Sequence, residues 1–141
     1  MNRTFWISVI VYLLATFVIA AGWHLFLFRD LYIQLAIFSR QEPLIPLGLI
    51  SMSIQAVLVA YLYPKIRGEG HPALEGLRFG IIIGALMASI GVFAEAGKQN
   101  VTSLSTWLVL ENIYYLLQFS VVGVLIGLVH GQTRFSNSLP R

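Results

Sequence analysis

Residues 5–28 read FWISVIVYLLATFVIAAGWHLFLF and decide the fold, because they contain no charged residue. An α-helix rises about 1.5 Å per residue, so about 24 residues are enough to cross the roughly 30 Å hydrocarbon core of a bilayer. A cleaved signal peptide has a shorter apolar core followed by a small-residue cleavage site. No such site precedes Trp23, and the stretch therefore predicts a retained transmembrane helix.

Three further apolar stretches have the same character, at about 44–63, 77–96 and 105–129. Prolines flank the first of these, and a glycine follows each of the other two, which is typical of helix ends. The alternating pattern of a membrane β-barrel does not occur. The sequence therefore predicts an all-α fold: a single four-helix transmembrane bundle over 1–134, built as two helical hairpins, followed by a polar tail at 135–141.

The composition of the 141-residue chain favours a membrane location. Charged residues make up 11% and hydrophobic residues 57%, whereas a soluble domain contains about 25% charged residues. The absence of cysteine excludes disulfides, thiolate metal ligands and cysteine nucleophiles. The net charge of +3 comes from basic residues beside the spans and not from a basic run, which argues against nucleic-acid binding.

These basic residues also predict an orientation, because cytoplasmic segments of membrane proteins carry an excess of Lys and Arg. With the N-terminus inside, the expected outer loops contain Arg29, Arg40 and Lys98. The larger group then lies inside: Arg3, Lys65, Arg67, Arg78, Arg134 and Arg141. We therefore expect an N-in/C-in topology, with the loop at 64–76 linking the two hairpins.

Small residues at four-residue spacing predict where helices pack, because transmembrane helices associate through close backbone approach more than through the hydrophobic effect. The third stretch carries Gly80, Gly84 and Ala88 on one face, and the fourth carries Gly123 and Gly127. Either these two helices pack against each other inside one bundle, or the glycines form a dimerisation face.

Polar residues inside the spans predict a candidate site, because a charge near the bilayer centre costs about 2.5–3.5 kcal/mol. Glu111, Tyr115 and Gln118 share one helical face at i, i+4, i+7 spacing. In the N-in topology, this face and its polar neighbours lie toward the outer side of the bilayer. The sequence predicts an outward-facing polar pocket formed by His24, Gln55, Glu95, Glu111, Asn112, Tyr115 and Gln118.

Two interpretations of these residues stay open. In the first, they bind an ion or a quinone-like or lipid-like ligand. In the second, the two glutamates pair with basic residues at the interface (Lys98, Arg29 or Arg40), and the amide and tyrosine side chains bond between helices. No His-x-x-x-His or Glu-x-x-His spacing indicates a metal site, and nothing specifies a cofactor. Because no nucleophile has an adjacent base and orienting group, we do not expect an enzyme.

The chain resembles a group of uncharacterised bacterial inner-membrane proteins with four helices. The resemblance extends from about Phe17 to Gly131 and rests on Gly22-Trp23-His24, Leu27-Phe28, Glu42-Pro43, Pro46-Leu47-Gly48, a glycine-rich third helix, and Glu111-Asn112-x-Tyr114-Tyr115 leading to Gly123-x-x-x-Gly127. It implies a four-helix fold in a bacterial inner membrane. It implies no substrate, because that group has no defined one.

These observations predict a small, non-catalytic integral membrane protein surrounded by membrane lipids. Short loops and the absence of an extramembrane domain favour a stand-alone bundle, a homo-oligomer, or an accessory subunit of a larger membrane complex. The alternative function is to bind or transport a small amphipathic ligand or an ion through the polar pocket. Since alternating-access transporters usually have larger repeated halves, transport by four helices would require a dimer.

Overall fold

The computed structural model describes residues 2–36 and 44–138, with side chains as far as residue 132, and over these residues its only regular secondary structure is helix. The helices are α1 (Arg3–Ala21), η1 (Gly22–Leu27), α2 (Arg29–Leu35), α3 (Ile45–Ile66), α4 (Pro72–Ala88), η2 (Ser89–Ala94) and α5 (Leu104–Ser138), and η1 and η2 are π-helical. Within the described ranges, four helical segments are long and apolar enough to cross a membrane: Arg3–Leu27, Ile45–Ile66, Pro72–Ala94 and Leu104–Gln132. The predicted all-α fold with four candidate spans is confirmed.

The link between the second and third spans is shorter than predicted. α3 continues through Pro64, and the backbone N–H of Arg67 still bonds to the carbonyl oxygen of Tyr63 at 2.9 Å. A proline so close to the helix end removes only one hydrogen bond of the last turn. At the start of α4, Pro72 occupies the first turn, where its missing N–H has no helical partner to lose. Only residues 67–71 separate the two helices.

The last helix is longer than predicted. α5 continues past Gly131, where we expected it to stop, and ends at Ser138. A glycine inside a helix costs only about 1 kcal/mol of stability. At Gly131, a Cβ would lie 2.7 Å from the ring of Pro72, so the glycine allows close contact with that ring. The expected polar tail at 135–141 is thus helical as far as the structure describes it. Arg40, Glu42, Pro43 and Arg141 lie outside the described residues.

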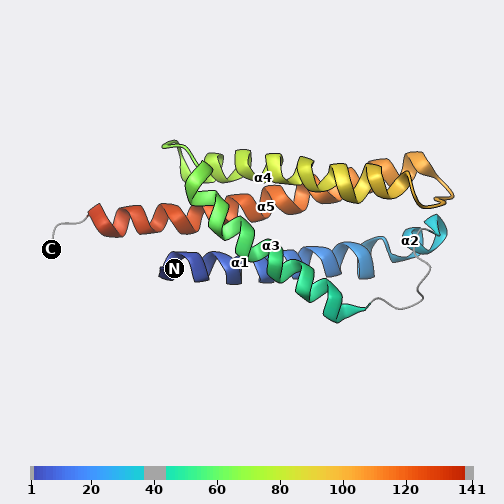
Figure 1. Ribbon diagram of the computed structural model, residues 1–141, viewed down its shortest axis with the longest axis horizontal. Helices are drawn as coiled ribbons and strands as arrows, with labels where there is room; N and C mark the ends of the chain where they lie inside the picture. The colour runs from blue at the N-terminus through green and yellow to red at the C-terminus, as the bar shows by residue number, and fades with distance from the viewer. Residues whose placement is uncertain (1, 37–43, 139–141) are drawn as a thin grey trace.

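α4 and α5 run antiparallel and make the most extensive contact of the bundle (Figure 1). A Cβ at Gly80 would overlap the carbonyl group of Phe119, and one at Gly123 would lie 2.8 Å from the Cα of Gly80. Gly84 and Gly127 lie in the same contact, where an added Cβ would be 3.2 Å from the Tyr115 carbonyl oxygen and 3.1 Å from the Gly76 Cα, respectively. The glycines therefore let the two backbones touch within a single chain.

α1 packs beside α5, and α3 crosses α1 obliquely (Figure 1). The start of α1 and the end of α5 lie at the same end of the molecule, which we call the proximal end. α3 contacts mainly α1, and its buried side chains all belong to its second half: Ala56, Val59, Ala60 and Tyr63. Its first half, from Ile45 to Ile54, has no fully buried side chain.

The opposite, distal end of the bundle contains η1, α2, η2 and the start of α5 (Figure 1). We expected a loop after the first span, but α2 folds back onto the bundle and buries Tyr32 and Leu35. Thr102 fixes this position, since its hydroxyl donates to the Gln34 carbonyl oxygen at 2.8 Å and its backbone N–H donates to the Leu35 carbonyl oxygen at 3.2 Å. Ala88 belongs to the apolar cluster beneath α2.

Candidate functional site

Glu111 is the centre of a buried polar cluster at the distal end. Its side chain is only 5% exposed although it belongs to the fourth span. The hydroxyl of Tyr32 on α2 donates a hydrogen bond to Oε1 of Glu111, and Nε2 of His24 on η1 lies 3.7 Å from the same oxygen. A buried carboxylate needs such partners, because an unpaired buried charge costs several kcal/mol. One side chain therefore connects η1, α2 and α5.

Trp23 extends this cluster toward the edge of the bundle. Its Nε1–H donates to the Tyr32 hydroxyl oxygen at 3.1 Å, so that Trp23, Tyr32 and Glu111 form a chain of hydrogen bonds. Burial, together with the charge of Glu111, raises the pKa of Tyr32 well above its ordinary value, which keeps its hydroxyl a proton donor. We call Trp23, His24, Tyr32 and Glu111 the Glu111 cluster.

Both π-helical segments border this region, and π-helical turns are frequent at functional sites. η1 carries Trp23 and His24 of the cluster. η2 lies against α5, where the carbonyl oxygen of Val92 accepts a hydrogen bond from Trp107 Nε1 at 3.2 Å and Gly91 lies against the ring of Tyr115. The distal end thus has irregular backbone on both sides of α5.

Two predicted site residues lie deeper in the bundle, away from the Glu111 cluster. Gln55 on α3 accepts a hydrogen bond from the Tyr12 hydroxyl at 2.7 Å and donates to Ser51 Oγ at 3.1 Å. Gln118 is buried, and its Oε1 has no hydrogen-bond partner among the described residues. The Gln55 amide thus bonds between and within helices, and neither amide belongs to the Glu111 cluster.

The remaining predicted site residues surround the cluster without joining it. Asn112 donates to the carbonyl oxygen of Leu108 on its own helix at 2.7 Å, and Tyr115 stacks on Phe119. Glu95 is half-buried directly after η2. Within the described part of the chain, neither Glu95 nor Glu111 forms an ion pair with Arg29 or Lys98; the third predicted partner, Arg40, lies outside the described residues.

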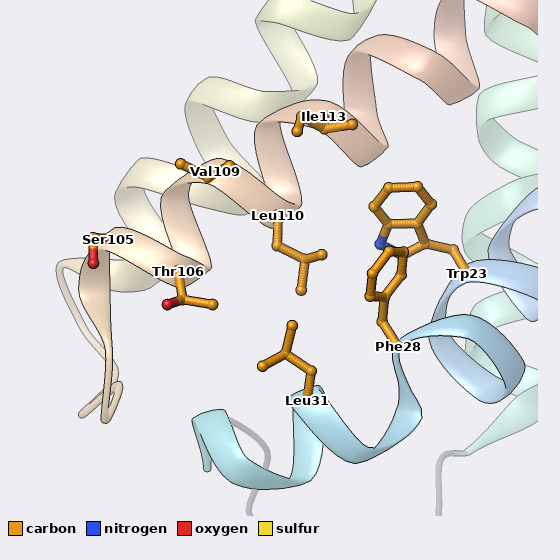
Figure 2. Close-up of a pocket in the computed structure, with 8 residues that line it drawn as sticks. All are labelled: Trp23, Phe28, Leu31, Ser105, Thr106, Val109, Leu110 and Ile113. Carbon is orange, nitrogen blue, oxygen red and sulfur yellow. The ribbon is translucent and has the colours of Figure 1, made fainter.

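An apolar pocket of about 480 Å³ lies between α2, the end of η1 and the first half of α5 (Figure 2). Apart from two hydroxyls near the start of α5, its walls are apolar, and no charged side chain lines it. Trp23 belongs to both the pocket and the Glu111 cluster. The lining residues are Trp23, Phe28, Leu31, Ser105, Thr106, Val109, Leu110 and Ile113.

None of the seven predicted site residues lines this pocket. The pocket could not be predicted from the sequence, because one of its walls is formed by α2, a segment that we expected to be a loop. The available signal was the i, i+3 spacing of Tyr32 and Leu35 after Arg29, which marks one face of a short helix. One helical turn is too short to distinguish such a face from chance.

The described residues contain no group of three or more His, Asp or Glu side chains that could hold a metal ion. Comparison of the chain with protein-family models, with curated proteins and with solved structures finds no match. The function therefore has to be inferred from the chemistry of the Glu111 cluster and the pocket.

Proposed function

We propose that this chain is a non-catalytic, multi-pass protein of the bacterial inner membrane that binds a lipid-like amphipathic ligand in the apolar pocket. The pocket is the observation that supports this function. Its volume of about 480 Å³ falls within the roughly 300–1,000 Å³ of small-molecule sites. It is bordered by Phe28, at the end of the first span, and Ser105, at the start of the fourth. A ligand there would lie where the hydrocarbon core meets the headgroups.

The lining favours a ligand with an apolar chain and a small uncharged head. Val109 and Ile113 follow one face of α5 into the membrane and offer contact to a hydrocarbon chain. Near the start of the helix, the Ser105 hydroxyl offers hydrogen bonds to a carbonyl or hydroxyl head, and the Thr106 hydroxyl, which bonds to Ser103 Oγ at 2.8 Å, has one further lone pair to offer. Because no lining side chain is charged, a charged head would gain no counter-ion. A quinone-like or long-chain alcohol-like molecule fits this chemistry.

The N-in/C-in topology is part of this proposal. It is supported by the basic residues at the proximal end, where Arg3, Lys65 and Arg78 are exposed. Positively charged residues of this kind favour the cytoplasmic side. The pocket, at the distal end, then opens at the outer leaflet.

Val109→Trp tests the ligand site. The Val109 side chain lines the pocket but is 62% exposed, so an indole there fills the pocket without entering the core. In lipid nanodiscs, we expect labelling by a photoreactive, uncharged long-chain alcohol to need at least about tenfold more probe, which corresponds to about 1.4 kcal/mol.

Val121→Trp is the matched control, because Val121 is on the same helix, is 42% exposed and does not line the pocket. It should label like the unmodified protein. Equal labelling of Val109→Trp and Val121→Trp would contradict the proposed site.

An accessory subunit of a larger membrane complex is the second candidate function. It is favoured by the first half of α3, which the described residues leave uncovered, and by the open space around Gly48, where no described atom would lie within 4 Å of an added Cβ. Purification from native membranes in mild detergent tests it. A stoichiometric second chain supports the subunit function, whereas a protein that migrates alone contradicts it.

A further inference from the structure

His24 and Glu111 face each other in an arrangement that requires a proton. Nδ1 of His24 lies 3.1 Å from the carbonyl oxygen of Ala20, and since a carbonyl only accepts, Nδ1 carries a hydrogen. In a neutral imidazole, the other nitrogen, Nε2, is then an acceptor. This nitrogen faces Oε1 of Glu111 at 3.7 Å, and a carboxylate oxygen is also an acceptor. The contact becomes attractive only when one of the two groups is protonated.

The other titratable groups around the pair do not replace this proton. Tyr32 from α2 donates its hydroxyl to Glu111, and Tyr114 from α5 packs edge-on against the His24 ring with centroids 4.4 Å apart. Glu95, directly after η2, is half-buried, and no ion pair joins it to His24 within the described residues. The charged residues of α2 are exposed: Arg29 and Asp30.

The pair is connected to the pocket through η1 and α2. Trp23, the neighbour of His24 in η1, lines the pocket and donates to Tyr32, which in turn donates to Glu111. α2 contributes Leu31, whose side chain points toward Leu110 of α5 (Figure 2). Contacts with the Glu111 carboxyl group therefore attach two walls of the pocket to α5, which forms the third.

We propose that His24 and Glu111 bind one proton between them and that this proton is linked to ligand binding in the apolar pocket. The inference rests on the proposed function. Loss of the proton leaves two acceptors facing each other, which weakens the attachment of η1 to α5 and loosens the wall formed by Trp23. By linkage, a ligand that binds the assembled walls prefers the protonated pair. Ligand affinity therefore falls as pH rises, and ligand binding takes up a proton.

Glu111→Gln tests the linkage, because an amide keeps the size of the carboxyl group but has no carboxyl group that can take up the proton. We expect the affinity of the unmodified protein for the photoreactive long-chain alcohol to fall about tenfold from acidic to alkaline pH, the size of one polar contact. Glu111→Gln should bind the alcohol with the same affinity at acidic and at alkaline pH. His71→Gln, which changes an exposed histidine between α3 and α4, should keep the pH dependence.

His24→Gln provides a second test if Glu111→Gln does not fold, and it should also abolish the pH dependence. Release or uptake of protons on adding the alcohol, followed with an indicator dye in weak buffer, should show uptake by the unmodified protein and none by either variant. A pH dependence that survives in the folded variants, or pH-independent binding by the unmodified protein, overturns the linkage. Labelling that Val109→Trp leaves intact overturns the ligand site itself, so the two failures are distinguishable.

Discussion

Gly80→Ala is expected to lower the free energy of unfolding by about 2 kcal/mol. The added methyl group would overlap the carbonyl group of Phe119 and lie 3.1 Å from the Cα of Ser120. These are backbone atoms that cannot rotate away, so α4 and α5 must separate along their contact. Overpacking of this kind costs about 1–3 kcal/mol, and the separation also weakens the neighbouring glycine contacts. The higher helix propensity of alanine offsets about 1 kcal/mol of the loss.

Gly48→Ala is the matched control for Gly80→Ala. Both glycines lie inside helices that are long and apolar enough to cross a membrane, but a Cβ at Gly48 would meet no described atom within 4 Å. The control should be at least as stable as the unmodified protein, because alanine is the better helix former. Unfolding in mild detergent with increasing SDS, followed by tryptophan fluorescence, measures both variants. If Gly80→Ala is as stable as Gly48→Ala, α4 and α5 do not make the close backbone contact described at Gly80.

Tyr32→Phe is expected to destabilise the protein by about 3 kcal/mol. The ring remains, but the hydroxyl that donates to Glu111 and accepts from Trp23 is lost. A hydrogen bond to a charged group contributes about 1.5–3 kcal/mol. Leaving a buried polar group without its partner costs more than an average hydrogen bond contributes. The Trp23 indole also loses its acceptor. Thermal unfolding in nanodiscs should show a clear decrease in midpoint.

The control for this change is Tyr61→Phe, because Tyr61 is 54% exposed on α3, where its ring lies under the Lys65 amine. Since the ring is retained, the free energy of unfolding of the Tyr61→Phe protein should change by less than about 0.5 kcal/mol. Replacing the carboxylate as well, in Tyr32→Phe/Glu111→Leu, should recover part of the loss, because removing both partners is less costly than removing one. A Tyr32→Phe protein as stable as Tyr61→Phe would show that Glu111 does not depend on the hydroxyl.

The four spans could be predicted because a long run without charge has few alternative environments to a bilayer. The ends of two spans could not be predicted correctly. Both wrong ends were placed at a proline or a glycine, which helices tolerate near their termini or at close contacts. Pro64 suggests a stop, yet it loses only one hydrogen bond in a last turn. Gly131 suggests another, yet its missing side chain makes room for Pro72. A residue that usually ends a helix can therefore lie inside one, where the last turn or a tertiary contact accommodates it.

The candidate site was predictable only in its ionisable residues. Glu111 and His24 were notable because charge inside a span is costly. Their partner Tyr32 was not, because its position depends on α2 folding back onto the start of α5. Thr102 fixes that fold through a contact with Gln34, 68 residues away in the sequence. Hydrophobic periodicity reports local geometry and does not report contacts over such separations.

The oblique course of α3 makes this helix the one most dependent on bilayer thickness. Its 22 residues measure about 33 Å along the axis, and an oblique helix projects a shorter length onto the membrane normal. Membranes whose hydrocarbon core is thicker favour a steeper course, and thinner membranes favour more tilt. The pair of α4 and α5 cannot adjust in this way, because their backbones are in contact through glycines. If these helices cross a bilayer, we therefore expect a change of lipid chain length to alter the tilt of α3 more than the packing of α4 against α5.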